Sequence, residues 1–425
     1  MAKKAKKAAN GSGTLRKRSD GSWEGRFVAG YDKDGKPIRK SVYARTKDDC
    51  AEKLRKATAE VDDGTYLEPS TLTVKQWFDI WLSEYMAAVK PLTVQQYRSM
   101  AESHIIPALG RTKLIKLTAP QLQKFFNQLA VDGKKTRRKN PETGKMEIVG
   151  AGEPLSTKTI RNIYDILSKA LNTAVSQKII KENVVRLVVI PKVIQKEVKP
   201  LDEDMQRSFI EAVQKHKYRN LFLIFLFCGL RESEAIGLTW DSFDAVKGTL
   251  KIYRQWQRTP GKWSQFRFEP LKNNKTRTIT LSPVVVSILK AQEAKQIQER
   301  FVAGRLWEGW DDDRERLGAA DDDKARNFIF TDEIGKPLNP APVYENFKKI
   351  AAEIGIPAAR VHDLRHSFAV NSLAEGDSPK TVQENLGHHS AAFTLDVYGH
   401  VSDRMKEESA KRQQLIAERL GLKNA

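Results

Sequence analysis

The chain has 425 residues, with 73 lysines and arginines against 53 acidic residues and a formal charge of +20. The length suggests roughly two to four domains, and the surplus of cations favours nucleic acid as a partner over an anionic membrane surface or an incidentally basic protein. The two cysteines, Cys50 and Cys228, are far apart in sequence, which argues against a disulfide framework or a zinc site. The apolar run 221–228 is too short to span a membrane, and the lysine-rich N-terminus does not fit a signal peptide. We therefore expect a cytoplasmic protein.

Residues 13–64 are predicted to form a small sheet followed by a helix. From Trp23 onward, apolar and polar residues alternate with a near period of two, which is typical of a strand. The sequence Asp-Lys-Asp-Gly at 32–35 predicts a hairpin turn, and the return strand is expected over 38–44. Thr46 is expected to cap the helix.

Residues 73–187 are predicted to be helical. Thr73 with Gln76, and Thr93 with Gln96, have the spacing of capping boxes. Apolar residues three and four apart on the first and last of these helices indicate core faces.

A polar insertion, residues 132–154, separates these helices. It is rich in lysine, arginine and glycine and too polar for a core. Two interpretations stay open: a flexible loop or hairpin that touches DNA, or a solvated insertion. Its candidate DNA contacts are Lys134, Lys135, Arg137 and Arg138.

Residues 191–200 begin and end with proline and carry charges, which is typical of a linker. A mixed α/β segment is expected after it. The acidic stretch 311–323 lacks the alternating ligands and central glycine of a calcium loop and is interpreted as a surface insertion. The fold class predicted for the chain is therefore multidomain α+β.

Six side chains of complementary chemistry occur in the last segment. Two arginines can grip a phosphodiester, imidazoles and an ammonium group can move its protons, and a phenol can attack it. Each residue alone is more often structural or solvated; an arginine at a helix start, for example, commonly pairs with an acid such as Glu234. Their combination indicates chemistry. The set is Arg231, Lys272, His362, Arg365, His388 and Tyr398.

Local sequence predicts where several of these residues lie. Gly229 permits a tight turn that places Arg231 at a helix start, where free backbone amides favour an anion. The sequence 270–279 is typical of a turn between two strands, with a lysine at its tip. His362 and Arg365 are three residues apart and therefore share one face of a helix.

These motifs resemble those of the tyrosine recombinases, and the whole chain is similar to phage and mobile-element integrases. The resemblance implies an arm-type DNA-binding domain over 13–64, a helical core-binding domain over 73–187 and a mainly helical catalytic domain over 200–425. It implies double-stranded DNA with core-type and arm-type attachment sites as the partner, a homotetramer on that DNA, and no cofactor. An excision factor and a host DNA-bending protein commonly accompany the family, in the bacterial or phage nucleoid.

The resemblance also assigns roles. Arg231 matches the first catalytic arginine, His362 and Arg365 the His-x-x-Arg pair, His388 the Leu-Gly-His histidine, and Tyr398 the nucleophile that forms a 3′-phosphotyrosyl link. Because that link keeps the bond energy, religation needs neither ATP nor metal.

The catalytic lysine is less closely matched. Lys272 corresponds to the family's hairpin lysine, but Asn273 follows it where threonine is usual, and the spacing to Arg277 is about one residue short. Lys275 therefore stays an alternative.

In the first segment, a three-stranded sheet of this type is expected to enter a major groove. Its candidate contacts are Trp23, Arg26, Arg39 and Lys40, although Trp23 also fits a core position. The tail after Tyr398 is expected to be helical and to pack in cis or on a neighbouring protomer.

Two alternative functions remain at this stage. One is a chromosome-dimer resolvase or type IB topoisomerase-like enzyme with the same chemistry, which the additional N-terminal domain disfavours. The other is a non-catalytic DNA-binding regulator, which the full set of catalytic residue types disfavours.

Overall fold

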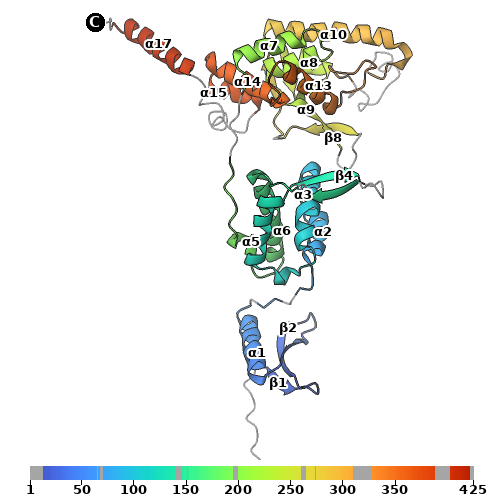
Figure 1. Cartoon of the computed structure of the whole chain (residues 1–425), viewed down its shortest axis with the longest axis vertical. Helices are drawn as coiled ribbons and strands as arrows, with labels where there is room; N and C mark the ends of the chain where they lie inside the picture. The colour runs from blue at the N-terminus through green and yellow to red at the C-terminus, as the bar shows by residue number, and fades with distance from the viewer. Residues whose placement is uncertain are drawn as a thin grey trace, which may run out of the picture. The chain divides into compact units, whose positions relative to one another are not determined.

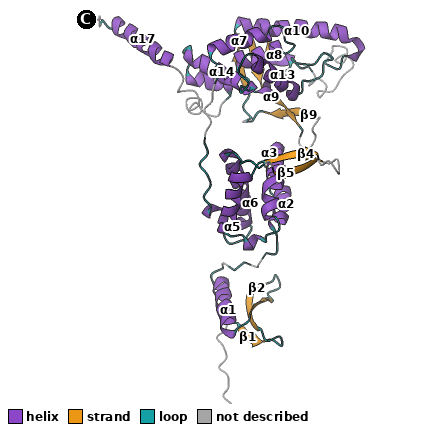
Figure 2. Cartoon of the chain, in the orientation of Figure 1, coloured by secondary structure: helices purple, strands orange, loops and turns teal. Residues whose placement is uncertain are grey.

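The computed structural model contains two compact units, Met1–Ile194 and Gln195–Ala425. It describes residues 13–64, 66–67, 70–139, 146–150, 152–194, 200–259, 265–272, 274–309, 327–387 and 403–421, of which 136–139, 146–149 and 403–409 are described by their backbone alone. Figure 1 labels the helices and strands, and Figure 2 shows that helices outweigh the small sheets. The mixed α+β class expected from the sequence is confirmed.

A three-stranded antiparallel sheet and one helix make up the first segment. Its elements are β1 (Thr14–Lys17), β2 (Trp23–Tyr31), β3 (Pro37–Ala44) and α1 (Lys47–Asp62), with the sheet order β1-β2-β3. Phe27 packs against Leu54 of α1, so the helix covers one face of the sheet. A bulge between Val28 and Gly30 breaks the period-two alternation, and Tyr31 beyond it is exposed.

Two local predictions in this segment are confirmed. The hairpin turn at 32–35 joins β2 to β3, with the N–H of Gly35 donating to the carbonyl of Asp32 over 3.0 Å. At the start of α1, the Thr46 hydroxyl accepts the N–H of Asp49 over 3.2 Å. This bond satisfies one of the amides that a helix start leaves without a helical partner.

The second segment is a helical bundle with one hairpin. Its main elements are α2 (Val74–Glu84), α3 (Pro91–Met100), the π-helical turn η1 (Ala101–Ile105), α4 (Ile106–Leu109), α5 (Ala119–Asp132), β4 (Lys135–Lys139), β5 (Met146–Gly150) and α6 (Thr157–Ser176). Trp77 and Trp81 of α2 are buried against α6, and their indole N–H groups donate to the Ala170 carbonyl and the Thr173 hydroxyl. The polar insertion thus contains a two-stranded antiparallel hairpin, β4–β5.

One of the two predicted capping boxes in this segment is confirmed and the other is wrong. The Thr73 side chain and Gln76 form reciprocal capping bonds at α2. Thr93, by contrast, lies inside α3, which begins at Pro91 after Lys90. Proline fixes the backbone angle of the first helical residue in advance, so the helix starts two residues before the threonine.

The second unit surrounds one buried helix, α8, with other helices and short strands. Its elements are α7 (Glu203–Val213), α8 (Arg219–Cys228), α9 (Glu232–Ile236), β6 (Phe243–Asp244), β7 (Thr249–Ile252), β8 (Arg254–Arg258), β9 (Phe266–Pro270), β10 (Arg277–Thr280), α10 (Pro283–Ala303), α13 (Pro340–Glu353), α14 (Val361–Ala374), α15 (Pro379–Leu386) and α17 (Asp403–Arg419). The sheet order is β10-β7-β6, and β8 pairs with β9. Burial accounts for the apolar run in α8, and it raises the pKa of Cys228 to about 12, which confirms this thiol as a buried apolar group.

Across the described ranges, no helix combines the length and apolar character needed to cross a bilayer. The acidic stretch 311–323 lies outside the described residues, as does the middle of the 191–200 linker.

Candidate active site

Arg231 occupies the predicted helix start. α8 ends at Gly229, whose φ of 60° is left-handed, and Arg231 precedes the first residue of α9. A Cβ at position 229 would lie 2.4 Å from Cδ1 of Phe368 and 2.8 Å from Cδ2 of Leu386, so glycine is required for space as well as for conformation. The sequence prediction for this turn is confirmed.

Two arginines converge on one buried carboxylate. Nη1 of Arg231 donates to Oε1 of Glu234 over 2.6 Å, and Nη2 of Arg277 donates to Oε2 over 2.7 Å. Glu234 is only 1% exposed. Burial on its own would raise its pKa, but the hydrogen bond and charge of Arg277, with the charges of Arg231 and Arg365, outweigh burial and lower the pKa to about 2. Glu234 is therefore a carboxylate at any working pH.

Three guanidinium groups bind three consecutive carbonyls at the C-terminal end of α15. Nε of Arg277 donates to Asn385 over 2.8 Å, Nη2 of Arg365 to Leu386 over 2.6 Å, and Nη2 of Arg231 to Gly387 over 3.2 Å. Carbonyls at this end of a helix lack helical partners and carry partial negative charge, so cations are favoured there. These hydrogen bonds hold the backbone in place as far as the residue before His388. The acceptors are Asn385, Leu386 and Gly387.

Arg365 is buried at the centre of this arrangement, 1% exposed. Its Nη1 donates to the carbonyl of Gly229 over 2.5 Å. Arg365 thereby links the turn before α9 to the end of α15, and the turn carries Arg231. The two predicted arginines, distant in sequence, are brought together.

His362 lies one turn before Arg365 on α14, as predicted. Its ring meets that of His366 edge to face, with centroids 4.7 Å apart. Burial of the ring is the largest cause that lowers the pKa of His362, and the positive charges of His366, Arg365 and Arg231 lower it further. Together they bring the pKa to about 4. The imidazole is therefore neutral at pH 7 and able to accept a proton.

The remaining predicted catalytic residues are only partly described. Lys272 and Lys275 are both exposed in the predicted turn between β9 and β10, where Asn274 has a φ of 50°. His388 and Tyr398 lie outside the described residues.

Sequence reasoning missed Arg277 as part of this cluster. Its partners Glu234 and Asn385 are 43 and 108 residues away in sequence, so no local pattern joins them. For Glu234 there was a signal, the three-residue spacing from Arg231, but it pointed equally to an ordinary ion pair.

The candidate DNA contacts of the first segment lie on two faces of its sheet. In the β2–β3 register, Phe27 is paired with Lys40, so Lys40 lies on the side covered by α1. Trp23, an even number of residues from Phe27, shares that side, and Lys47 lies over its ring at 5.7 Å. Arg26 lies on the opposite face and is exposed. Arg39, which is paired with Val28, lies on that same face and is also exposed.

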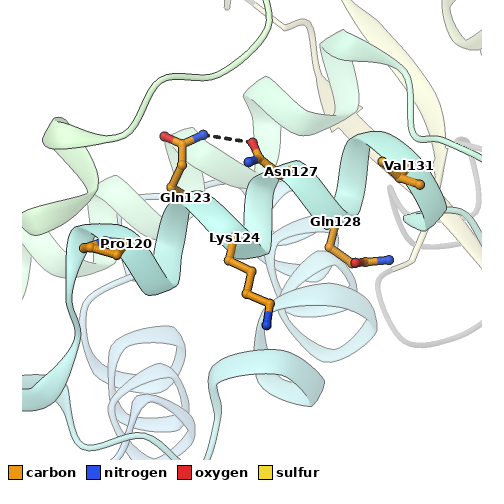
Figure 3. Close-up of a pocket in the computed structure, with 6 residues that line it drawn as sticks. All are labelled: Pro120, Gln123, Lys124, Asn127, Gln128 and Val131. Atoms are coloured by element: carbon orange, nitrogen blue, oxygen red, sulfur yellow. Dashed lines mark hydrogen bonds between the residues drawn. The ribbon is translucent and has the colours of Figure 1, made fainter.

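In the helical segment, Lys134 pairs with Glu153 over 2.5 Å, and Lys135 begins β4. The side chains of Arg137 and Arg138 lie outside the described residues. A shallow hollow of about 440 Å³ lies on α5, and in Figure 3 Gln123 and Asn127 are joined there by a hydrogen bond of 2.9 Å. Its lining is Pro120, Gln123, Lys124, Asn127, Gln128 and Val131. It holds no carboxylate, imidazole, hydroxyl or thiol beside Lys124, so the hollow does not fit an active site for phosphodiester cleavage.

Comparison with known proteins gives consistent results. The phage integrase family matches residues 195–405, and the phage integrase N-terminal SAM-like domain matches residues 73–130. A "Tyrosine recombinase XerC-like" protein of Caldanaerobacter subterraneus subsp. tengcongensis is 25% identical over 90% of this chain and 93% of its own. An integrase of Saccharopolyspora erythraea is 24% identical over 97% of this chain and 98% of its own.

Among solved structures, the Tn1549 transposon integrase in complex with transposon right end DNA has a similar fold, with a TM-score of 0.62 and 20% identity over 81% of this chain and 100% of that one. The two family models match the helical segment and the second unit, and the second unit contains the arginine cluster. The chain belongs to the phage integrase family, and it is a tyrosine recombinase, an enzyme that breaks and rejoins DNA strands.

Proposed function

We propose that this recombinase is an integrase that inserts, and also excises, a mobile element or phage genome at specific attachment sites. The observation that carries its strand-cleaving chemistry is the meeting of Arg231 and Arg365 at the end of α15, immediately before His388 in the sequence. Similarity to integrases along nearly the whole chain supports the same assignment.

In this proposal, Tyr398 is the nucleophile. Its phenolic oxygen attacks the phosphorus, the bond from phosphorus to the 5′ oxygen breaks, and a 3′-phosphotyrosyl link and a free 5′ hydroxyl form. The phenol has an ordinary pKa of about 10, so its proton must be removed at the phosphate. His362 is neutral at pH 7, so its ring nitrogen is free to accept that proton. Lys272, or alternatively Lys275, delivers a proton to the leaving 5′ oxygen, and His388 donates a hydrogen bond to the phosphate.

The two arginines stabilise the charge that develops on the non-bridging oxygens. Arg231 is partly exposed, 27% of its side chain, so it can meet a phosphate directly. Arg365, by contrast, is buried, with 1% of its surface exposed. We therefore expect the surroundings of Arg365 to rearrange when a phosphodiester binds.

The partner is double-stranded DNA, with the three segments 13–64, 73–187 and 200–425 acting as arm-type, core-binding and catalytic domains. Exchange between two duplexes needs two pairs of active sites, which supports a homotetramer. Exposed Leu415 and Leu420, on and just after α17, suit packing against a neighbouring protomer, although packing in cis remains the alternative. An excision factor and a host DNA-bending protein remain expectations from the family.

One experiment tests the chemistry. The protein is incubated with a nicked attachment-site duplex, and a denaturant-resistant protein–DNA adduct is sought for the wild type and for Tyr398→Phe. An adduct with the wild type alone is expected. An adduct with both proteins would remove Tyr398 from its role, and no adduct with either would favour the DNA-binding regulator.

A chromosome-dimer resolvase is the second candidate, because the XerC-like relative aligns along most of both chains. The two differ in their substrates. An integrase recombines two non-identical attachment sites, whereas a resolvase recombines two copies of one site, so a two-plasmid recombination assay separates them.

A further inference from the structure

The exposed face of the first segment's sheet contains a buried carboxylate. Glu24 of β2 has only 4% of its side chain exposed, although it lies on the face opposite α1. Nε of Arg16 donates to its Oε2 over 2.5 Å, and Nε of Arg26 donates to its Oε1 over 3.0 Å. The Ser41 hydroxyl donates to Oε1 over 2.8 Å. One carboxylate thus receives donors from all three strands.

The register explains this convergence. Arg16 of β1 is paired with Glu24, and Glu24 is paired with Tyr43 of β3. Paired residues of antiparallel strands point to the same face, and so does Arg26, two residues further along β2. The hydrogen bonds from Ser41 and then Arg26 lower the pKa of Glu24 to about 2, so the group is charged.

The two arginines remain available beyond this carboxylate. Their side chains are 57% and 48% exposed, for Arg16 and Arg26 respectively. Each arginine uses Nε for Glu24 in these bonds, which orients its planar guanidinium group. Arginine presented in this way suits the paired acceptors on the edge of guanine. Three strands spaced about 4.8 Å apart place the outer two roughly 10 Å apart, within a major groove about 12 Å wide.

We propose that Glu24 is a positioning residue for DNA sequence recognition: it holds Arg16 and Arg26 in fixed directions so that they read base edges in the major groove. This inference rests on the proposed function, because it takes duplex DNA as the partner of this segment. It adds Arg16 to the candidate contacts and Glu24 as the residue that positions them, and it distinguishes the face carrying Arg26 from the face carrying Lys40.

Positioning by Glu24 and simple electrostatics predict changes of opposite sign in DNA affinity when Glu24 is replaced by glutamine. Removing a negative charge from a DNA-facing surface should strengthen binding to any duplex. If Glu24 positions the two arginines, Glu24→Gln should instead weaken binding to the recognised sequence, because the guanidinium groups lose their fixed direction. The effect expected on that sequence is about tenfold or more, since one good bidentate base contact is worth roughly that in discrimination.

The experiment uses the full chain. Duplexes enriched by the wild type from a random-sequence 40-base-pair pool are sorted by whether Arg16→Ala and Arg26→Ala weaken their binding. Binding of the sorted duplexes and of an unselected duplex is then measured by fluorescence anisotropy for Glu24→Gln and for a matched control, Glu52→Gln, which removes the same charge from an exposed position on α1.

We expect Glu24→Gln to lose affinity for the sorted duplexes at least about tenfold and to bind the unselected duplex as tightly as the wild type or more tightly. Binding is measured below the unfolding transition found for each variant, so that only folded protein is compared. Glu52→Gln should bind the sorted duplexes within about threefold of the wild type. Equal affinity of the two variants overturns the inference, as does an equal loss on all duplexes, or the absence of any duplex that depends on Arg16 and Arg26. Failure to form the Tyr398 adduct would instead overturn the recombination chemistry and leave this result unaffected.

Discussion

Replacing Arg277 by alanine tests whether the buried ion cluster is as tightly coupled as its geometry indicates. The change removes the 2.7 Å bond to Oε2 of Glu234 and the 2.8 Å bond to the carbonyl of Asn385. Glu234, which is 1% exposed in the wild type, would then lose one of the two cations that bind it. Breaking a buried pair by deleting one partner typically costs about 3–5 kcal/mol.

The lowered pKa of Glu234 gives an independent value for the free energy of unfolding that this cluster contributes. A shift of the Glu234 pKa from 4.5 to about 2 corresponds to about 3 kcal/mol of stability, at about 1.4 kcal/mol per unit. Because the folded-state pKa lies below the unfolded value, this stabilisation is fully present above pH 4.5 and is lost as the pH falls towards 2. The variant should lose most of this pH dependence.

The assay is thermal and urea unfolding of the full chain, followed for the transition of the second unit. At about 2–4 °C per kcal/mol for a unit of this size, we expect Arg277→Ala to lower its Tm by roughly 6–20 °C. The matched control is Arg267→Ala, whose 2.5 Å pair with Glu269 is much more exposed, at 47% and 27% of the side chains; such pairs contribute up to about 1 kcal/mol. Equal losses in the two variants, or an unchanged pH slope between 4.5 and 2, would refute the reasoning.

Two further predictions concern the same unit. Arg365→Lys keeps the charge but not the two-pronged guanidinium, so cleavage should fall about 100-fold or more while DNA binding, by anisotropy, changes only a few-fold; loss of binding as large as the loss of cleavage would contradict a catalytic role. His362 should titrate with a pKa of about 4 in an NMR pH series. Since that is below its ordinary value of about 6.5, the unfolded chain binds more protons between these values, and stability should fall as the pH drops from 6.5 to 4. The fall should be smaller in His362→Gln, where His366, whose pKa is also lowered to about 4, still contributes.

Local signals in the sequence were reliable where one interaction decides the structure. The helix cap at Thr46, the box at Thr73 and the turn at Gly229 depend on residues within three or four positions, and all are present. The box at Thr93 failed because a neighbouring signal, Pro91, determined the helix start.

Features that depend on tertiary contacts were not predictable in the same way. Arg277 joins the cluster through partners far along the chain, and a single sequence gives no sign of that pairing. Similarly, alternation along β2 indicated a strand, but only the register assigns Arg26 and Lys40 to opposite faces. The alternation also predicts that the polar residues of β2 are exposed, whereas Glu24, on the face opposite α1, is buried.

The crowded glycine at the end of α8 limits how this enzyme can be redesigned. The backbone oxygen of Gly229 accepts a hydrogen bond from Arg365, and a Cβ at this position would meet Phe368 and Leu386. A methyl group there would act as a wedge between α14 and α15, and the left-handed backbone would disfavour it independently. A variant designed to recognise a different DNA sequence therefore has to keep glycine at position 229, however its DNA-contacting residues are changed.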